Sequence, residues 1–300
     1  GVRVTRILVT GVNGQVGFEL LRACQPLGEV IGLDRRALDL TDPQAIRRVL
    51  REAKPDVILN PAAYTAVDQA EQDERTATAI NGDAVAVMAE EAARLKALFV
   101  HYSTDYVFDG TKDGAYTETD TPNPQSAYGR SKLAGEQALQ ASQADWLCLR
   151  TSWVFASRGK NFLRTILRLA AEREELRIVA DQVGAPTSAR LIAEATAQIV
   201  GRTRHRNDRA NFESGIYQLT AAGSTSWHGF AQTIVHEAQH APSPPALKAA
   251  RIIPISTEEY PLPARRPRNS RMSCAAAEAR FDLKLPPWER GVALSIAELF

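Results

Sequence analysis

The sequence predicts an α/β fold with a doubly wound parallel sheet and a smaller, mixed C-terminal lobe. Short β-branched runs alternate with longer segments whose apolar residues recur at helical spacing, as expected for parallel strands joined by crossover helices. After Arg150 the alternation loosens, and polar loops separate the predicted elements. We therefore expect a sheet domain over residues 1–155 and a lobe over residues 156–300, with some segments at about 176–202 returning to the sheet.

The predicted elements follow this alternation. Strands are predicted over Arg6–Thr10, Glu29–Leu33, Asp56–Asn60, Leu98–Ser103 and Trp146–Arg150. Between them, good helix formers carry apolar residues at helical spacing, over Gln15–Ala23, Pro43–Glu52, Ala84–Leu95 and Ser131–Ala141. In the lobe the pattern predicts helices over Asn161–Glu174 and Ser188–Val200, and strands over Gly215–Leu219 and Arg251–Ile255.

Length and composition are those of an ordinary globular protein. The chain has 300 residues, of which 44% are hydrophobic and 24% charged, enough for a full core. A formal net charge of +1 argues against a dedicated nucleic-acid-binding protein. Three widely spaced cysteines without a CxxC pair indicate neither a disulfide framework nor a zinc ribbon. No apolar run approaches the ~18 residues of a membrane helix, and Gly1-Val2-Arg3 lacks the apolar stretch of a signal peptide, so we expect a cytoplasmic protein.

A glycine-rich turn follows the first predicted strand and opens the first predicted helix. Its sequence is Gly11-Val12-Asn13-Gly14-Gln15-Val16-Gly17. Gly11 would allow the tight turn, Gly14 the close approach of a pyrophosphate, and Gly17 the close packing of the helix on the strand. The helix N-terminus would supply N–H donors to the anion. This context predicts a dinucleotide-binding domain of the Rossmann type.

The second predicted strand ends at a carboxylate that suits the adenosine ribose. Asp34 stands where it can accept hydrogen bonds from the ribose hydroxyls. Arg35 and Arg36 follow directly and could pair with a ribose 2′-phosphate, although an exposed pair of arginines more often lies in a solvated loop. The sequence therefore leaves NADPH and NADH both open.

Three further side chains predict hydride chemistry. Tyr128 and Lys132 stand at i and i+4, on one face of a helix. A free tyrosine titrates near pH ~10, and a neighbouring ammonium is expected to lower the pKa of the phenol so that Tyr128 can act as a general acid. Thr104 follows a predicted strand at the edge where open α/β sheets bind ligands, and it can donate to a carbonyl oxygen. Together with the glycine turn and Asp34, this order predicts a nicotinamide-dependent reductase.

Longer motifs carry a specific resemblance. His101–Gly110 (HYSTDYVFDG) and Tyr128–Glu136 (YGRSKLAGE) resemble segments of the dTDP-4-dehydrorhamnose reductase family, within the extended short-chain dehydrogenase/reductase superfamily. Further resembling segments extend almost from end to end: Asn60–Asp68, Arg150–Phe155, Asp181–Thr187 and Arg266–Ser270. Sugar-nucleotide epimerases of the superfamily usually carry a Ser-rich segment ending in Val-Tyr-Gly where this chain has Ser-Thr-Asp-Tyr-Val-Phe.

The resemblance implies reduction of the C4 ketone of dTDP-6-deoxy-L-lyxo-4-hexulose to dTDP-L-rhamnose. In this interpretation Tyr128 protonates the developing alkoxide, Thr104 donates a hydrogen bond to the same oxygen, and Lys132 holds the nicotinamide ribose. The implied cofactor contacts, including those of the glycine turn, are Gly11, Gly14, Gln15, Val16, Gly17, Asp34, Asp39, Leu40, Ala63, Tyr64, Thr65, Tyr128 and Lys132. The implied sugar-nucleotide contacts are Thr104, Asp105, Tyr128 and Trp153. Arginines suited to the diphosphate are Arg265, Arg266, Arg268 and Arg271.

Two alternatives stay open at this point. The β subunit of methionine adenosyltransferase resembles the same family, so one alternative is a non-enzymatic, NADP-binding regulatory subunit. The other is a related nucleotide-sugar epimerase or a different 4-keto reductase. Intact Thr104, Tyr128 and Lys132 favour an enzyme.

We expect no resident metal. His236–His240 matches the HExxH pattern of zinc proteases, but its apolar spacing makes it the polar face of a helix. Some members of the resembling family form a dimer bridged by magnesium through glutamates. Glu19 and Glu298 match two of those positions, whereas the third is Arg190, whose cation would repel a divalent metal. We therefore expect a monomer or homodimer whose partner is a dTDP-sugar.

Overall fold

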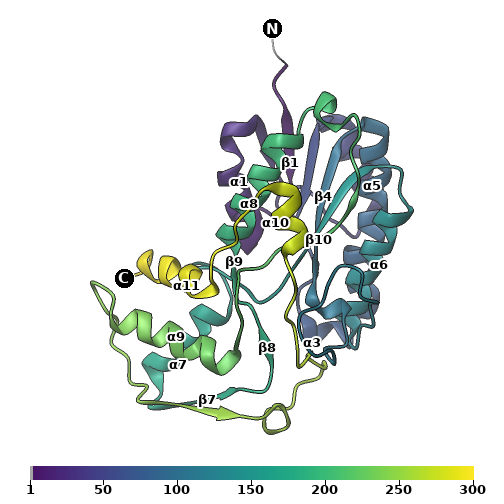
Figure 1. Cartoon of the computed structure of the whole chain (residues 1–300). Coiled ribbons are helices and arrows are strands. Elements are labelled where there is room, and N and C mark those ends of the chain that lie inside the picture. The colour runs from purple at the N-terminus through teal and green to yellow at the C-terminus, as the bar shows by residue number, and fades with distance from the viewer. Residues whose placement is uncertain (1–2) are drawn as a thin grey trace.

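Six parallel strands form the central sheet of the computed structural model, which describes residues 3–300 and so leaves Gly1 and Val2 of the N-terminal segment outside it. The strand order is β10-β5-β4-β3-β1-β2 (Figure 1). The strands are β1 (Arg6–Val9), β2 (Glu29–Gly32), β3 (Val57–Asn60), β4 (Leu98–Thr104), β5 (Asp145–Thr151) and β10 (Gly215–Gln218). From β1 the sheet extends to β2 on one side and through β3, β4 and β5 on the other. The predicted doubly wound α/β fold is therefore confirmed.

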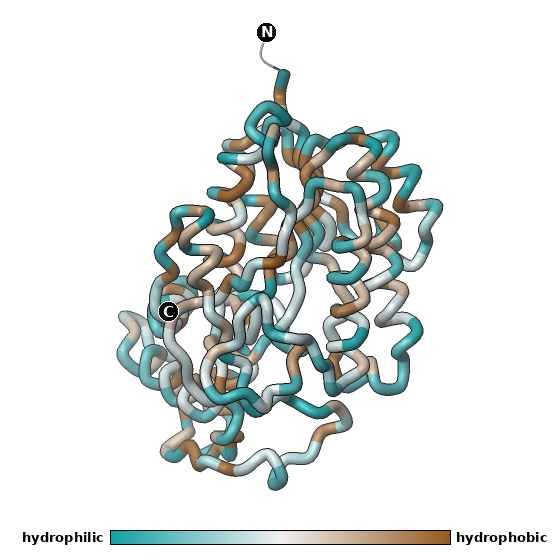
Figure 2. Tube along the Cα trace, turned by 45° about the vertical axis from the view of Figure 1, so that its right-hand side comes forward, coloured by the Kyte–Doolittle hydropathy of each residue, from teal (hydrophilic) through white to brown (hydrophobic). Residues whose placement is uncertain are grey.

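Alternate side chains of the strands supply a core on each face of the sheet. In β1, Ile7 and Val9 pack on one side and Leu8 on the other. The first face is covered by α1 (Gln15–Ala23), α8 (Ala189–Thr203) and α10 (Ala275–Phe281). The second is covered by α2 (Pro43–Ala53), α5 (Ala84–Leu95) and α6 (Ala127–Ala141). Figure 2 shows hydrophobic residues along the inner strands and hydrophilic residues in the outer turns, as two flanking cores require.

The C-terminal lobe has a separate core and lies beyond the carboxyl ends of the sheet strands (Figure 1). Its helices are α7 (Phe162–Glu172), α9 (Trp227–Gln239) and α11 (Trp288–Ala297). Three short strand pairs complete it: β7 (Glu175–Val179) with β12 (Arg251–Ile255), β6 (Val154–Phe155) with β9 (Thr187–Ser188), and β8 (Val183–Gly184) with β11 (Thr225–Ser226). No helix within residues 3–300 is both long and apolar enough to cross a membrane.

Two short helices and a π-helical turn lie between β3 and α5. They are α3 (Val67–Ala70), α4 (Glu74–Thr78) and the π-helical turn Ala79–Asp83, which runs directly into α5. Single 3-10 turns cover Gln25–Leu27, Asp105–Val107, Arg206–Arg209 and Thr257–Glu259.

The structure differs from the sequence prediction at three places. The strand expected in the lobe at Gly215–Leu219 is β10, which pairs with β5 at the edge of the central sheet. Within residues 176–202, α8 covers the sheet, whereas β7 pairs with β12 in the lobe. These partners are set by tertiary contacts that a strand of four or five residues does not encode. Helix α6 begins at Ala127, earlier than expected, because the Ser126 hydroxyl accepts a hydrogen bond from the Gly129 N–H and caps it.

Candidate active site

The turn between β1 and α1 has the shape of an anion-binding turn. Gly11 has a φ of +57°, and a Cβ there would lie 2.9 Å from the Cβ of Ala62. A Cβ on Gly17 would lie 2.1 Å from the carbonyl oxygen of Gly11, so only glycine lets α1 pack this closely. Gly14 is the N-cap of α1, and within the described chain no side chain caps its first turn. The N–H groups of that turn are therefore left to bind an anion, so the turn fits a dinucleotide pyrophosphate.

The carboxylates predicted to meet the adenosine half follow β2, which pairs directly with β1. Asp34 is half-buried, and its Oδ1 accepts a hydrogen bond of 2.9 Å from the N–H of Ala37. Asp39 accepts from the hydroxyl and the N–H of Thr41, and these bonds hold the pKa of its carboxyl below the ordinary value. Val16 and Leu40, the apolar members of the predicted set, are half-buried.

The segment after β3 is fixed by a residue that the sequence analysis missed. The Asn81 side chain accepts from the Tyr64 N–H (2.9 Å) and donates to the Tyr64 carbonyl (3.0 Å). It also donates to Ser131 Oγ of α6 (2.9 Å). Asn81 is 1% exposed, and it lies in the π-helical turn. The amide therefore joins the segment of Ala63, Tyr64 and Thr65 to the helix of Tyr128. A poor helix former followed by Gly82 inside a helical pattern was the available signal.

The structure brings Thr104, Tyr128 and Lys132 together. Thr104 ends β4, Tyr128 lies in the first turn of α6 with its hydroxyl near the Thr104 side chain, and Lys132 follows one turn later. Burial raises the pKa of the Tyr128 phenol, and the charge of Asp105 raises it further, although the nearby Thr104 hydroxyl lowers it. The expected lowering by the ammonium is wrong here, because Lys132 Nζ donates to the carbonyl of Tyr102 (2.6 Å). Tyr128 therefore stays protonated at neutral pH, as a general acid must be.

A buried ion pair fixes α6 against the sheet. Arg150 of β5 donates from Nε and Nη2 to the two carboxylate oxygens of Glu136, at 2.9 and 2.7 Å. Both side chains are 1% exposed. The Ser103 hydroxyl donates to the same carboxylate at 2.5 Å. Because Ser103 precedes Thr104 and Glu136 follows Lys132 by one helical turn, this ion pair sets the spacing between Thr104 and Lys132.

Two predicted sugar-nucleotide contacts lie at the same edge of the sheet. Asp105 is 3% exposed, and its Oδ1 accepts from the Thr104 hydroxyl (3.2 Å). Its Oδ2 is buried and has no partner within residues 3–300, and burial raises the pKa of the carboxyl to about 6. Trp153 follows β5 two residues after Thr151, which lies opposite Thr104 in the strand register. An unpaired acceptor and a half-buried indole at the same edge of the sheet fit a ligand with both polar and apolar faces.

Of the arginines suited to the diphosphate, Arg266 lies near Tyr106, whose ring contacts that of Tyr128. Its guanidinium pairs with both carboxylate oxygens of Asp68, with Nη2 2.8 Å from Oδ2. Arg268 instead pairs with the exposed carboxylate of Glu258 at 2.9 Å. Arg266 thus links the C-terminal segment to α3 at the mouth of the site.

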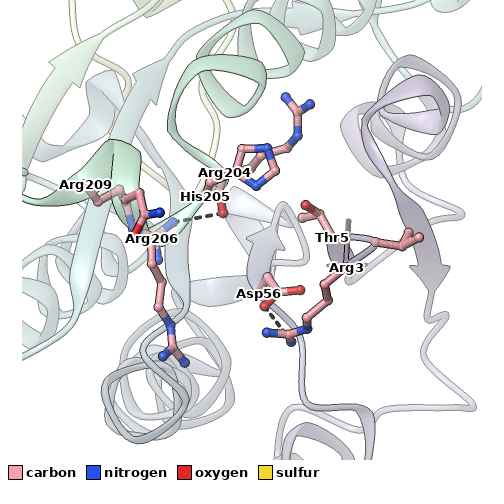
Figure 3. Close-up of a pocket in the computed structure, with 9 residues that line it drawn as sticks. Arg3, Thr5, Asp56, Arg204, His205, Arg206 and Arg209 are labelled. Carbon is pink, nitrogen blue, oxygen red and sulfur yellow. Dashed lines mark hydrogen bonds and ion pairs between the residues drawn. The ribbon is translucent and has the colours of Figure 1, made fainter. Parts of the chain in front are cut away.

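A separate cationic cavity of about 330 Å³ lies at the opposite end of the sheet, away from the catalytic residues (Figure 3). Arg3 is paired there with Asp56 (2.9 Å), and Arg209 donates to the carbonyl of Arg204 (3.1 Å). In Figure 3 the guanidinium groups of Arg204 and Arg206 point away in opposite directions. The side chains of this cavity therefore do not converge on one ligand.

The magnesium position implied by the family resemblance does not fit a metal in this chain. Arg190 lies between the two glutamates, with Nε 3.5 Å from Glu19 Oε2 and Nη1 2.6 Å from Glu298 Oε1. A guanidinium therefore occupies the centre that a divalent cation would need. Within the described chain, no cluster of three or more His, Cys, Asp or Glu side chains is placed to hold a metal.

An open parallel sheet, a glycine turn at its first strand and a Tyr–Lys pair on the helix before β5 define the extended class of short-chain dehydrogenases/reductases. The family model described as the RmlD substrate binding domain matches residues 5–300. The dTDP-4-dehydrorhamnose reductases of Burkholderia thailandensis and Escherichia coli are 53% and 44% identical to the chain, over 98% of its length and 99% and 98% of theirs. The chain therefore belongs to the dTDP-4-dehydrorhamnose reductase family, and the resemblance seen in the sequence is confirmed.

Solved structures agree with this assignment. The dTDP-4-dehydrorhamnose reductase of Bacillus anthracis in complex with NADP has a TM-score of 0.89 and 33% identity, covering 99% of this chain and 100% of that one. The UDP-glucose 4-epimerase of Thermus thermophilus, with NAD, has a TM-score of 0.78 over 97% and 98% of the two chains, but only 20% identity, so it shows the fold alone.

The buried carboxyl of Asp105 predicts a pH-dependent stability. Its pKa is about 6 in the folded protein against an ordinary 3.8, so the native state binds the proton more tightly than the unfolded state. The free energy of unfolding then falls as the pH rises from about 4 to about 6. We expect Asp105→Asn to be more stable than the wild type by up to about 3 kcal/mol at neutral pH, with no gain near pH 4. Denaturant unfolding at the two pH values measures this, and an equal gain at both would contradict it.

Asn81→Asp should uncouple the segment after β3 from α6. The substitution keeps the shape of the side chain but removes the two hydrogen bonds that the amide donates to the Tyr64 carbonyl and to Ser131 Oγ. A buried carboxylate oxygen would then face the Tyr64 carbonyl. We expect a loss of about 2–4 kcal/mol in the free energy of unfolding and at least a roughly tenfold weaker affinity for NADPH. Asn207→Asp, at an exposed position of the 3-10 turn Arg206–Arg209, is the matched control. If folded Asn81→Asp binds NADPH as tightly as the wild type, the hydrogen bonds of Asn81 do not determine the shape of the cofactor site.

Proposed function

We propose that this protein reduces the C4 ketone of dTDP-6-deoxy-L-lyxo-4-hexulose to dTDP-L-rhamnose, with NADPH or NADH as the reductant. The observation that carries the proposal is that the Thr104 and Tyr128 hydroxyls lie close together at the carboxyl end of β4, on the same edge as the glycine turn. The family and its relatives named dTDP-4-dehydrorhamnose reductase support the substrate.

The reaction needs a hydride at C4 and a proton at the ketone oxygen. The reduced nicotinamide supplies the hydride. Tyr128 supplies the proton, since its raised pKa keeps the phenol protonated until negative charge develops beside it. The Thr104 hydroxyl oxygen accepts from the N–H of Tyr106 (3.1 Å), and its proton, which is donated to Asp105 Oδ1 (3.2 Å), would instead be donated to the substrate oxygen when the ketone is bound. Lys132 is held against β4 one turn from Tyr128, where its ammonium would bind the nicotinamide ribose.

The cofactor would extend from Tyr128 and Lys132 across the glycine turn to the carboxylates after β2. Asp34 suits the ribose hydroxyls of NADH, whereas exposed Arg35 and Arg36 suit the 2′-phosphate of NADPH. The segment of Ala63, Tyr64 and Thr65 would cover the middle of the dinucleotide. This arrangement supports use of both nicotinamide cofactors.

We infer a monomer or homodimer that acts in the cytoplasm and does not bind nucleic acid. The Arg190 position supports assembly without a bridging metal, because its guanidinium already neutralises Glu19 and Glu298. A net charge of +1 supports the absence of a nucleic-acid partner. Cys24, Cys148 and Cys274 carry free thiols, which fits a reducing compartment.

Tyr128→Phe should abolish turnover while cofactor binding is retained, because the phenyl ring keeps the packing but has no proton to give. We expect kcat to fall roughly 10²- to 10⁴-fold. Oxidation of NADPH and NADH is followed by absorbance with dTDP-4-keto-6-deoxyglucose and its 3,5-epimerase, and omission of the epimerase is the control. No turnover by the wild type with cofactor still bound would sink the proposal and favour a regulatory subunit.

Arg190→Glu should create a need for a cation that the wild type lacks. Three carboxylates would then face one another at a partly exposed position, so we expect the Tm to fall by a few degrees and to recover with magnesium. Arg190→Gln, which adds no carboxylate, controls for the lost ion pairs. Thermal scans and light scattering with magnesium or a chelator test this, and a wild type whose mass or Tm depends on magnesium would contradict it.

A further inference from the structure

Trp153 adopts a backbone conformation that a bulky side chain rarely takes. Its φ of +49° lies in the left-handed region. Strain of this kind persists only where the surroundings enforce it, and it concentrates at functional sites. Trp153 follows two residues after Thr151, the register partner of Thr104. The enforced position therefore lies at the edge of the sheet where a ligand is expected.

Contacts on several sides enforce the orientation of the Trp153 indole. The Thr187 N–H donates to its carbonyl (3.1 Å), which anchors the backbone. A Cβ on Gly184 would lie 2.8 Å from its Cε2, so the ring packs directly on the backbone at this glycine. The indole of Trp227 stacks on it, with ring centroids 3.7 Å apart and planes inclined by 14°. These contacts leave the ring a single orientation.

Hydrogen bonds fix both the helix end that carries Trp227 and its indole ring. It is the first residue of α9, whose N-cap Ser226 accepts from the Gly229 N–H (3.0 Å). Its Nε1–H donates to Gln182 Oε1 (3.1 Å), and buried Gln182 donates in turn to Thr257 Oγ1 (3.2 Å). Both indoles remain half-buried. The stacked pair is therefore a rigid aromatic surface that still has an open part.

We propose that Trp227 is a positioning residue that sets Trp153 as the aromatic wall for the sugar ring of the nucleotide-sugar substrate. The inference rests on the proposed function, which puts the C4 carbonyl against Thr104 and Tyr128. A deoxysugar has an apolar face of C–H groups and a methyl, which suits an indole, and hydroxyl groups, which suit the unpaired oxygen of Asp105. Trp227 would act on the affinity for the sugar and leave the hydride step unaffected.

The test compares Trp227→Leu with Trp227→Phe in the full-length protein. We expect Trp227→Leu to raise the KM for the sugar nucleotide roughly tenfold while kcat changes less than about threefold, and Trp227→Phe to restore most of the affinity. Calorimetry with dTDP-L-rhamnose and with dTDP separates the sugar from the nucleotide. The loss should appear with dTDP-L-rhamnose and be absent with dTDP and with NADPH.

Trp288→Phe is the matched control, since Trp288 is a buried tryptophan of the same lobe whose ring is paired with Phe230. Near-UV circular dichroism should lose the signal of the stacked pair in Trp227→Leu and keep it in Trp288→Phe. An unchanged KM in Trp227→Leu, an equal loss for dTDP, or the same loss in Trp288→Phe would overturn the inference. A wild type that binds dTDP-L-rhamnose without turnover would refute the proposed function, while the binding comparison would still decide the role of Trp227.

Discussion

The bidentate ion pair between Glu136 and Arg150 is the interaction on which the site depends. Both charges are buried, so removal of one partner would leave the other unpaired at a cost of about 3–5 kcal/mol. The pair spans α6 and β5, the Ser103 hydroxyl brings in β4, and Gln218 Oε1 accepts from Arg150 Nη1 (3.4 Å) to bring in β10. One interaction thus aligns the helix of the general acid with the strand ends.

Next to the Glu136–Arg150 ion pair, the site contains groups that lower the stability of the folded protein. Asp105 is a buried carboxyl with an unpaired oxygen, burial lowers the pKa of Lys132 to about 8, and Trp153 has a left-handed backbone. A ligand could supply the partner that Asp105 Oδ2 lacks. Strained backbone and perturbed pKa values of this kind concentrate at functional sites. The sheet edge contributes the proton donor and the cofactor turn, and the lobe contributes the indole that supports Trp153.

Features that depend on neighbouring residues could be predicted from the sequence, whereas contacts between distant segments could not. The glycine turn, the i, i+4 spacing of Tyr128 and Lys132, and Thr104 at the end of a strand are all readable from short windows. Asn81 was missed because its amide bonds to segments 17 and 50 residues away along the chain. The sequence predicted a lowered pKa for Tyr128, whereas burial raises it. Helical spacing shows that Lys132 is near Tyr128 but not where its ammonium points.

By itself, the sequence determined the α/β class, the glycine turn after the first strand and the family, because periodicity, glycine spacing and motif order can be recognised without coordinates. Only the tertiary structure decided that β10 joins the central sheet, that Arg190 stands between two glutamates, and that Trp227 stacks on Trp153. The physical reason is that hydrogen-bond partners, ion pairs and ring stacks are set by which segments meet in space, and burial then fixes their protonation and orientation.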